Sequence, residues 1–258
     1  MRWMWSLGDY APLADALEPH SEALADACQI HPGSAVLDVA AGNGNFALAA
    51  ARRGAVVTAS DLTPRMVELG RARSAAASNI EWAEADAQAL PFADARYDVV
   101  ASVFGAMFAP QPALVAAELF RVAKRGGLVA MANYSPGGYL GRLSEMIASF
   151  SARPAFELPS PFQWGDEDEV RRRLAPHTDS IELTRRRLSF ESNSIESFLE
   201  FWEATNPPQN ALKAMLPPEP YQKMIEANRE LLEELNESTT GQLKVSSPYL
   251  MVLARKPR

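Results

Sequence analysis

Hydrophobic and polar positions follow two alternating patterns along the first half of the chain. Runs of six or seven residues rich in apolar side chains recur at 35–40, 55–61, 80–86, 97–103 and 128–134. Between them, apolar residues recur at helical spacing over 13–30, 45–54, 63–77 and 112–123. Short apolar runs suit strands that are buried on both faces, and the longer segments are typical of amphipathic helices. The alternation predicts an α/β fold in which helices cover both faces of a mostly parallel sheet.

The second half of the chain shows a looser pattern. It predicts helices at 138–150 and 166–175 with a Pro-rich loop at 154–164, and further strands at 180–191 and 246–256. These two strands complete a seven-stranded sheet. Helical spacing between them, interrupted by proline pairs, predicts a helical insertion near the C-terminus. We expect a single domain, 1–258, made of an N-terminal helical cap (1–32), a core (33–135), the rest of the sheet and its helices (136–190 and 244–258) and a helical lid insertion (191–243).

The stretch LDVAAGNGNF, residues 37–46, joins the first predicted strand to a helix through a glycine-rich turn. Glycine lets a backbone approach a ligand closely, and the start of a helix offers free N–H groups. The stretch also fits the dinucleotide pattern G-x-G-x-x-A at Gly42, Gly44 and Ala47, with Asp61 downstream. A tight turn that binds nothing would look the same, so this motif alone leaves the ligand open.

Three carboxylates at successive strand ends narrow the choice of ligand. Asp38 precedes the glycine turn by four residues, where it would repel a pyrophosphate and attract a cation. Asp61 ends the second strand, where a carboxylate can accept both hydroxyls of a ribose. Asp86 ends the third, and with the backbone N–H of Ala87 it can pair with the edge of an adenine. A cation, a ribose and an adenine in this order describe S-adenosylmethionine.

Four segments in this order resemble the class I S-adenosylmethionine-dependent methyltransferases over about residues 33–135. They are VLDVAAGNG (36–44), ASDLTPRMVELGRAR (59–73), AEADAQALPFADARYDVV (83–100) and ELFRVAKRGGLVAMA (118–132). The segment looks most like the ubiquinone/menaquinone-type branch, whose members act on small molecules. One departure is Ala40, where the family often has the first glycine of its loop; alanine also occurs there in this branch.

The resemblance implies a role for each matching residue. Asp38 and the loop 40–44 hold the amino-acid end of the cofactor, Asp61 its ribose, and Asp86 its adenine. The end of the fourth strand lies under the reactive sulfonium, and a tyrosine of the N-terminal cap contacts the cofactor. The implied cofactor-binding set is Tyr10, Asp38, Ala40, Gly42, Gly44, Asp61, Leu62, Met66, Asp86, Ala87, Ser102 and Val103.

Aromatic residues outside the sheet fall in segments that cover the carboxyl ends of the strands in this fold, where ligands bind. We expect them to wall an apolar acceptor pocket, with the segment 1–10 closing over the cofactor. In the alternative to this closure, the two tryptophans of the segment pack on the surface of the insertion. Residues 191–243 alone would then line the acceptor pocket. The expected acceptor residues are Trp3, Trp5, Phe104, Phe108, Phe162, Trp164, Phe198 and Trp202.

Methyl transfer from a sulfonium is an in-line displacement of an already activated group. Alignment of donor and acceptor alone can supply about 7–11 kcal/mol, and a general base is needed only if the acceptor must lose a proton. The sequence identifies no catalytic residue. His20, His31 and His177 are interpreted as cap or surface residues. Whether oxygen, carbon or nitrogen is methylated stays open.

Composition limits the remaining classes of function. The net charge of −7 disfavours nucleic acid as a partner, and the single cysteine, Cys28, fits a reducing cytoplasm. We expect no metal, no membrane span and no signal peptide. The sequence thus predicts a cytoplasmic methyltransferase with a small-molecule acceptor. Two alternatives remain: an enzyme of the same fold that methylates nothing, for example a cyclase, and an NAD-linked oxidoreductase.

Overall fold

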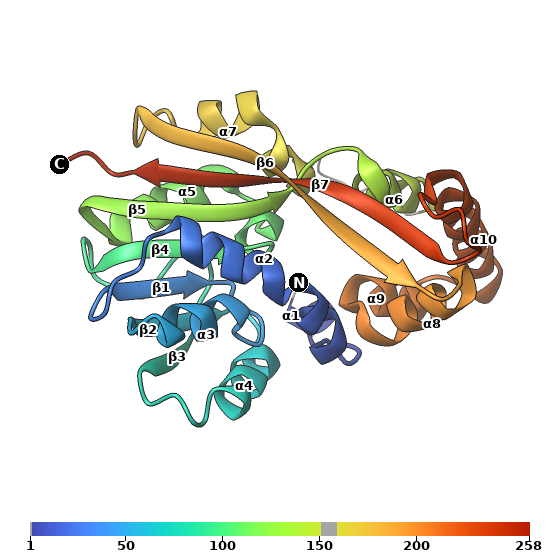
Figure 1. Cartoon of the computed structure of the whole chain (residues 1–258), viewed down its shortest axis with the longest axis horizontal. Helices are drawn as coiled ribbons and strands as arrows, with labels where there is room; N and C mark the ends of the chain where they lie inside the picture. The colour runs from blue at the N-terminus through green and yellow to red at the C-terminus, as the bar shows by residue number, and fades with distance from the viewer. Residues whose placement is uncertain (1, 151–158) are drawn as a thin grey trace.

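The computed structural model describes residues 2–150 and 159–258 and contains a seven-stranded sheet (Figure 1). The strand order is β3-β2-β1-β4-β5-β7-β6, and β7 alone runs antiparallel to its neighbours. This arrangement confirms the expected α/β class with a mostly parallel sheet. The strands are β1 Ala35–Val39, β2 Val56–Asp61, β3 Ile80–Glu84, β4 Tyr97–Val103, β5 Ala123–Tyr134, β6 Ser180–Ser192 and β7 Leu243–Arg255.

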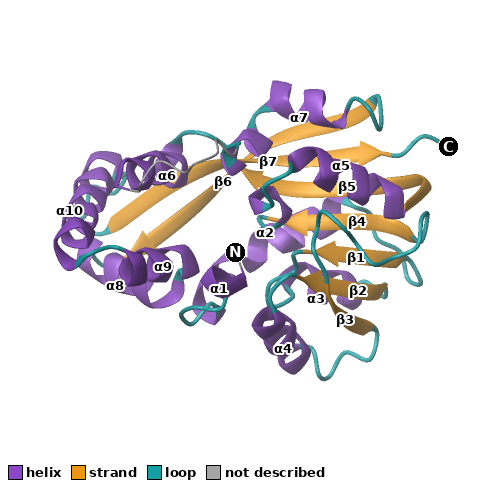
Figure 2. Cartoon of the chain, turned by 180° about the vertical axis from the view of Figure 1, so that it is seen from behind, coloured by secondary structure: helices purple, strands orange, loops and turns teal. Residues whose placement is uncertain are grey.

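Helices cover both faces of the sheet. The helices α2 (Ala11–Ala27) and α3 (Asn45–Arg52) lie on the face seen in Figure 1, and α5 (Pro112–Val122) and α7 (Glu167–Leu174) lie on the face seen in Figure 2. Alternate residues of a strand point to opposite faces. In β1, Val36 therefore joins the apolar core under α2 and α3, whereas Leu37 joins the core under α5 and α7. The helix α4 (Pro64–Arg73) packs beside β2 and β3.

The strands β6 and β7 extend beyond the rest of the sheet. Residues 249–255 of β7 pair with β5, whereas residues 243–248 pair with β6 alone. Helices gather on this overhang and form what we call the lobe (Figure 1). They are α6 (Gly138–Phe150), α8 (Ile195–Thr205), α9 (Pro207–Met215) and α10 (Pro218–Leu235). The last three lie within the expected helical insertion. The N-terminal helix α1 (Arg2–Trp5) packs on α9.

Some predicted boundaries differ from the structure. The strand β3 ends at Glu84, so Asp86 lies beyond it in a short bridge with Ala89. The strand β5 begins at Ala123 because the segment after α5 stays paired through an irregularity in the β4–β5 register. Of the expected loop 154–164, residues 154–158 lie outside the described residues and Pro161–Gly165 form a 3-10 helix. Within the described ranges, no helix is long and apolar enough to cross a membrane.

Candidate cofactor and acceptor site

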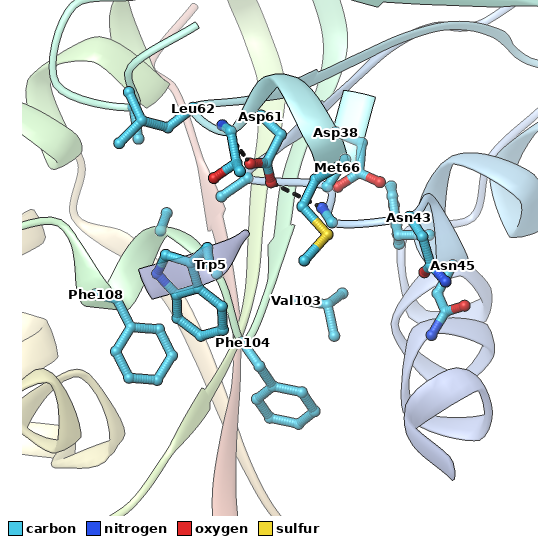
Figure 3. A pocket seen from close by; sticks show the side chains of 18 of the residues that line it. Trp5, Asp38, Asn43, Asn45, Asp61, Leu62, Met66, Val103, Phe104 and Phe108 are labelled. Atoms are coloured by element: carbon cyan, nitrogen blue, oxygen red, sulfur yellow. Dashed lines mark hydrogen bonds between the residues drawn. The ribbon is translucent and has the colours of Figure 1, made fainter. Parts of the chain in front are cut away.

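A pocket opens at the carboxyl ends of β1, β2 and β4, and the space between its walls and out into the solvent amounts to about 1000 Å³. The turns after these strands and the start of the chain line it, so residues far apart in the sequence meet there (Figure 3). The predicted residues that line it are Trp5, Tyr10, Asp38, Ala40, Gly42, Asp61, Leu62, Met66, Asp86, Ala87, Val103, Phe104 and Phe108.

Asp38 places a carboxyl group in the wall of this pocket without a cationic partner. The side chain is 1 % exposed, and its Oδ2 accepts a hydrogen bond from the backbone N–H of Ala47 at 2.9 Å. No lysine, arginine or histidine in the described part of the chain forms an ion pair with it. Burial raises the pKa of Asp38 to about 8, although the Ala47 N–H opposes this shift. A cationic group, such as the ammonium of S-adenosylmethionine, fits this carboxyl, whereas a pyrophosphate does not.

The carboxylate of Asp61 is held in place by two backbone donors. Its Oδ2 accepts from the N–H of Gly42 at 2.9 Å, and its Oδ1 accepts from the N–H of Thr63 at 2.8 Å (Figure 3). The pKa of Asp61 is raised because the effect of burial exceeds the opposing effect of these two N–H groups. Each oxygen keeps a further lone pair, because a carboxylate oxygen can accept two hydrogen bonds. A pair of ribose hydroxyls fits this arrangement.

Asp86 is oriented by the turn that follows it. Its Oδ1 accepts from the backbone N–H of Gln88 at 2.9 Å, and the Gln88 side-chain amide lies 3.1 and 3.2 Å from the two carboxylate oxygens. Gln88 Oε1 in turn accepts from the N–H of Gln111 at 3.0 Å. Gln88 itself lines the pocket, which the sequence did not predict. The adenine edge expected at Asp86 would therefore also meet the amide of Gln88.

The glycine turn has a left-handed backbone at Ala40 (φ +54°), Gly42 (+57°) and Gly44 (+93°). A Cβ on Gly42 would lie 3.3 Å from the ring of Tyr10, so this tyrosine covers the turn. A Cβ on Gly44 would lie 2.9 Å from the ring of Trp82. Gly44 does not line the pocket. The structure thus places Gly44 against a side chain of β3, whereas the resemblance placed it against the cofactor.

Aromatic rings wall the side of the pocket opposite the two carboxyl groups (Figure 3). Trp5 meets Phe108 edge to face, with 5.4 Å between ring centroids. Phe104 stacks on Tyr134 at 4.2 Å. Both Trp5 and Phe108 lie beside the turn after β4, so the start of the chain and the end of a central strand build one wall.

Contacts on both sides hold the N-terminal segment at this position. Arg2 forms an ion pair of 2.6 Å with Glu84 at the end of β3. On the other side, the backbone N–H of Asp9 donates to the carbonyl of Ala204 in α8 at 3.1 Å. The segment therefore connects the core of the sheet to the lobe beside the pocket. Of its two tryptophans, Trp5 lines the pocket and Trp3 is 51 % exposed outside it.

Five further predicted residues do not line the pocket. Ser102 lies beneath its floor, where its hydroxyl donates to the Val39 carbonyl at 2.7 Å and accepts from the Ala106 N–H at 2.9 Å. Trp164 is 1 % exposed in the core under α5 and α7, because the guanidinium of Arg173 packs on its ring. The other three are Phe162, which packs near Tyr134, and Phe198 and Trp202, which are buried in the lobe.

The sequence also missed pocket residues, most of them neighbours of predicted ones. Thr63 and Gly105 follow predicted residues directly, and this position could have identified them. Leu17 and Ser21 lie on α2, whose orientation no motif indicates. Ala41 and Asn43 lie in the loop 40–44 that the resemblance assigned to the cofactor, and the lining residues missed are Leu17, Ser21, Asn45, Phe46, Thr63, Ala85, Gln88, Gly105, Ala106 and Ala109.

His20 differs from its interpretation as a residue just outside a helix. It lies within α2, and its Nδ1 is 3.3 Å from the hydroxyl of Tyr249. Its ring meets Phe104 edge to face at 6.0 Å. Burial lowers the pKa of His20, so the imidazole is neutral at pH 7. In the described ranges, no group of three or more His, Cys, Asp and Glu side chains could hold a metal ion.

Comparisons of sequence connect this site to known proteins. Residues 37–131 match a family described as "Methyltransferase domain". An uncharacterised protein of Mycobacterium tuberculosis is 42 % identical over 194 residues, which cover 74 % of this chain and 70 % of the relative. A demethylmenaquinone methyltransferase of Clavibacter sepedonicus is 40 % identical over 103 residues, 40 % of this chain and 42 % of that protein.

Solved structures share the fold at lower sequence identity. The YcgJ protein of Bacillus subtilis has a TM-score of 0.68 at 17 % identity and covers 93 % of this chain and 99 % of its own. A phosphoethanolamine N-methyltransferase of Haemonchus contortus, in complex with S-adenosylmethionine, has a TM-score of 0.58 at 18 % identity. The match covers 93 % of this chain and 53 % of that protein. With the motifs and the family match, the chain belongs to the class I methyltransferases, enzymes whose cofactor is S-adenosylmethionine.

Proposed function

We propose that this enzyme methylates a small, uncharged acceptor of apolar or aromatic character. One observation carries the proposal: the charged side chains that line the pocket are Asp38, Asp61 and Asp86, all acids. No lysine, arginine or histidine is among the lining residues in the described ranges. A phosphate or carboxylate on the acceptor would meet three acids and no cation in a partly desolvated site, which is unfavourable.

The cofactor, when bound, supplies a methyl group activated on a sulfonium, and the protein has to align the acceptor with it. Asp38 would hold the ammonium, Asp61 the ribose, and Asp86 the adenine edge. The rings of Trp5, Phe104 and Phe108 then offer an apolar surface to the acceptor. Aromatic faces also attract cations, which supports their position near a sulfonium.

Two tyrosines, Tyr10 in the pocket wall and Tyr134 stacked on Phe104 outside it, favour hydrogen bonding over proton abstraction. Burial, and after it the nearby Asp61, raise the pKa of Tyr10 to about 12. Burial also raises the pKa of Tyr134 well above its usual value. Both phenols therefore stay protonated at neutral pH and can donate a hydrogen bond. Alignment carries the reaction in this proposal, with no tyrosine acting as a base.

Relatives support the class of acceptor only in outline. The demethylmenaquinone methyltransferase named above matches over residues that amount to 40 % of this chain, so its acceptor does not transfer residue by residue. The [4+2]-cyclase SpnF has a TM-score of 0.57 at 18 % identity, and the match covers 93 % of this chain and 80 % of SpnF. At this identity the likeness shows the fold alone. The choice between methylation and other chemistry therefore rests on a measurement.

The test is a labelled-methyl screen preceded by mass spectrometry of co-purified ligands. Purified protein and methyl-labelled S-adenosylmethionine are incubated with a metabolite extract that has been separated into neutral and anionic fractions. We expect label in the neutral, organic-extractable fraction, and much less with Asp61→Ala at a cofactor concentration near the dissociation constant of the wild type. Label confined to the anionic fraction would contradict the proposed acceptor. Conversion of a metabolite without label would indicate a non-methylating enzyme, and NADH binding without S-adenosylhomocysteine binding would indicate an oxidoreductase.

A further inference from the structure

Ser21 is a buried polar residue that faces the pocket without a hydrogen-bond partner. It lies on α2, is 1 % exposed and lines the pocket together with Leu17, one helical turn earlier. Within the described ranges, no hydrogen bond involves its hydroxyl. The Ser21 oxygen is not among the fully buried side-chain atoms that lack a partner in the described ranges, so it borders the open space of the pocket, where water or a ligand can pair with it. An unpaired hydroxyl in a pocket wall therefore points to a ligand atom.

Other buried helical hydroxyls in this chain show the usual alternative. Such groups commonly bond to the carbonyl four residues earlier. Ser74 donates to the carbonyl of Gly70 at 2.7 Å, and Thr205 donates to that of Phe201 at 2.7 Å. The corresponding carbonyl for Ser21 is that of Leu17, and Ser21 does not bond to it. Its proton and lone pairs thus remain available to the pocket.

The neighbourhood of Ser21 favours the acceptor over the cofactor as its partner. The preceding residue of α2, His20, contacts the ring of Phe104, which belongs to the aromatic wall. The ammonium, the ribose and the adenine of the cofactor have expected partners in Asp38, Asp61 and Asp86, and the resemblance assigns the rest of its amino-acid end to the loop 40–44. A neutral hydroxyl beside Leu17 in the pocket wall matches a neutral oxygen of the acceptor better than a charged group.

We propose that Ser21 forms the hydrogen bond that recognises an oxygen-bearing group, a hydroxyl or a ketone, on the otherwise apolar acceptor. The inference rests on the proposed function and names the chemistry of its acceptor more closely. A site with a buried hydrogen-bonding group discriminates strongly against an analogue that lacks the matching group, because the protein group is then left unpaired. Ser21 therefore selects oxygenated acceptors over hydrocarbons of the same shape.

The experiment compares two probes that differ by one hydroxyl, 2-naphthol and naphthalene, on protein saturated with S-adenosylhomocysteine. Calorimetry measures both affinities in the wild type and in Ser21→Ala. We expect the wild type to bind 2-naphthol about tenfold more tightly than naphthalene, the factor of one good hydrogen bond. In Ser21→Ala the ratio should fall to near one, with the affinity for S-adenosylhomocysteine unchanged.

Thr205→Val is the matched control, because it also removes a buried helical hydroxyl but lies in the lobe. It should lower the melting temperature through the loss of its bond to Phe201 and leave the naphthol ratio unchanged. Ser21→Ala should not lower the melting temperature of the ligand-free protein, since its hydroxyl has no bond to lose. This difference separates a role in recognition from a role in packing.

Each other outcome has a distinct meaning. A naphthol ratio that is the same in Ser21→Ala and in the wild type would overturn the inference and leave the proposed function intact. A weaker affinity of Ser21→Ala for S-adenosylhomocysteine would assign the hydroxyl to the cofactor and also overturn it. If neither probe binds the wild type, the apolar acceptor of the proposed function is wrong, and the role of Ser21 is wrong with it.

Discussion

Two regions of this molecule are rich in aromatic residues, and they use them differently. In the lobe, the rings of Phe190, Phe198 and Trp202 lie 5.3–5.8 Å apart and are buried against one another. At the pocket, Trp5 and Phe108 meet as a pair beside empty space. Residue type is the same in both regions, so composition alone does not distinguish a core from a wall. Whether an aromatic ring belongs to a core or to a wall depends on whether other side chains cover its remaining faces.

Backbone strain marks the second region. Phe104 has a φ of +52°, which is unusual for a bulky residue, and Ala40 across from it has a φ of +54°. Between them, a Cβ on Gly105 would lie 2.4 Å from the Ala40 carbonyl oxygen. Helices α8, α9 and α10 of the lobe contain no residue with a positive φ in the described ranges. The pocket therefore borders a turn with left-handed residues, whereas α8, α9 and α10 of the lobe are regular helices.

The largest predicted effect is on the lobe. Trp202→Ala removes a side chain that is 5 % exposed and packed on three other rings, those of Tyr139, Phe190 and Phe198. It should lower the free energy of unfolding by about 3–5 kcal/mol, because the surrounding side chains cannot fill the cavity. Urea denaturation measures this, and calorimetry at low temperature should show unchanged affinity for S-adenosylhomocysteine.

Phe108→Ala is the matched variant at the pocket. It should lower stability much less than Trp202→Ala, because Phe108 is only partly buried and borders empty space. Equal losses of stability in the two variants would remove the distinction between wall and core. A loss of cofactor affinity in a folded Trp202→Ala protein would show that the lobe contributes to the site directly.

The second effect concerns the ribose contact. Asp61→Ala should weaken binding of S-adenosylhomocysteine by about 1.5–3 kcal/mol, the range for hydrogen bonds to a charged group. Asp98→Ala is the control, since Asp98 also accepts a backbone N–H, that of Ala35 at 2.9 Å, but at the opposite end of the sheet. We expect Asp98→Ala to lower stability and leave the affinity unchanged. An unchanged affinity in Asp61→Ala would reject the ribose assignment.

The third effect is a pH dependence caused by Asp38, whose pKa is raised to about 8 by burial. The carboxyl must lose its proton to pair with an ammonium, so affinity should rise by about tenfold per pH unit between pH 6 and about 8. The ligand-free protein should respond in the opposite direction. A raised pKa means that the neutral form is favoured by folding, so this stability is lost as the pH rises through about 8.

Asp38→Asn is the control for both parts of this prediction. It should bind S-adenosylhomocysteine weakly at every pH and show a melting temperature that no longer falls near pH 8. Calorimetry in buffers with different ionisation heats counts the protons released on binding. Wild-type binding that releases no proton at pH 7 would contradict the pairing of Asp38 with the ammonium.

The smallest effect tests the strained turn itself. Ala40→Gly should raise the free energy of unfolding by about 0.5 kcal/mol, since relief of left-handed strain, about 1–2 kcal/mol, exceeds the entropic cost of a glycine, about 0.5–1 kcal/mol. Denaturation curves of the two proteins measure the difference. A clear loss of stability would mean that packing of the Ala40 methyl group outweighs the strain.

The sequence alone determined the sheet and the polar side of the pocket. Apolar runs alternating with helical segments specify parallel strands, and the carboxyl ends of such strands meet at one edge of a sheet. Asp38 and Asp61, at or near the ends of two of these strands, and Asp86, just beyond a third, therefore meet in one pocket wherever the elements pack regularly. Asp38 and Asp86 are positioned by backbone groups close to them in the sequence, and Asp61 by Thr63 and by Gly42 of the preceding motif, so the motifs were sufficient to identify all three acids.

Only the tertiary structure decided which apolar residues face the ligand. Trp164, Phe198 and Trp202 pack into cores, and Ser21 and His20 on α2 border the site, although no local pattern separates the two groups. Hydrophobic burial is not directional, and it rewards an aromatic ring equally in a core and in a pocket wall. The direction each ring faces depends on how helices distant in the sequence pack on the sheet, and that packing is specified by the whole chain.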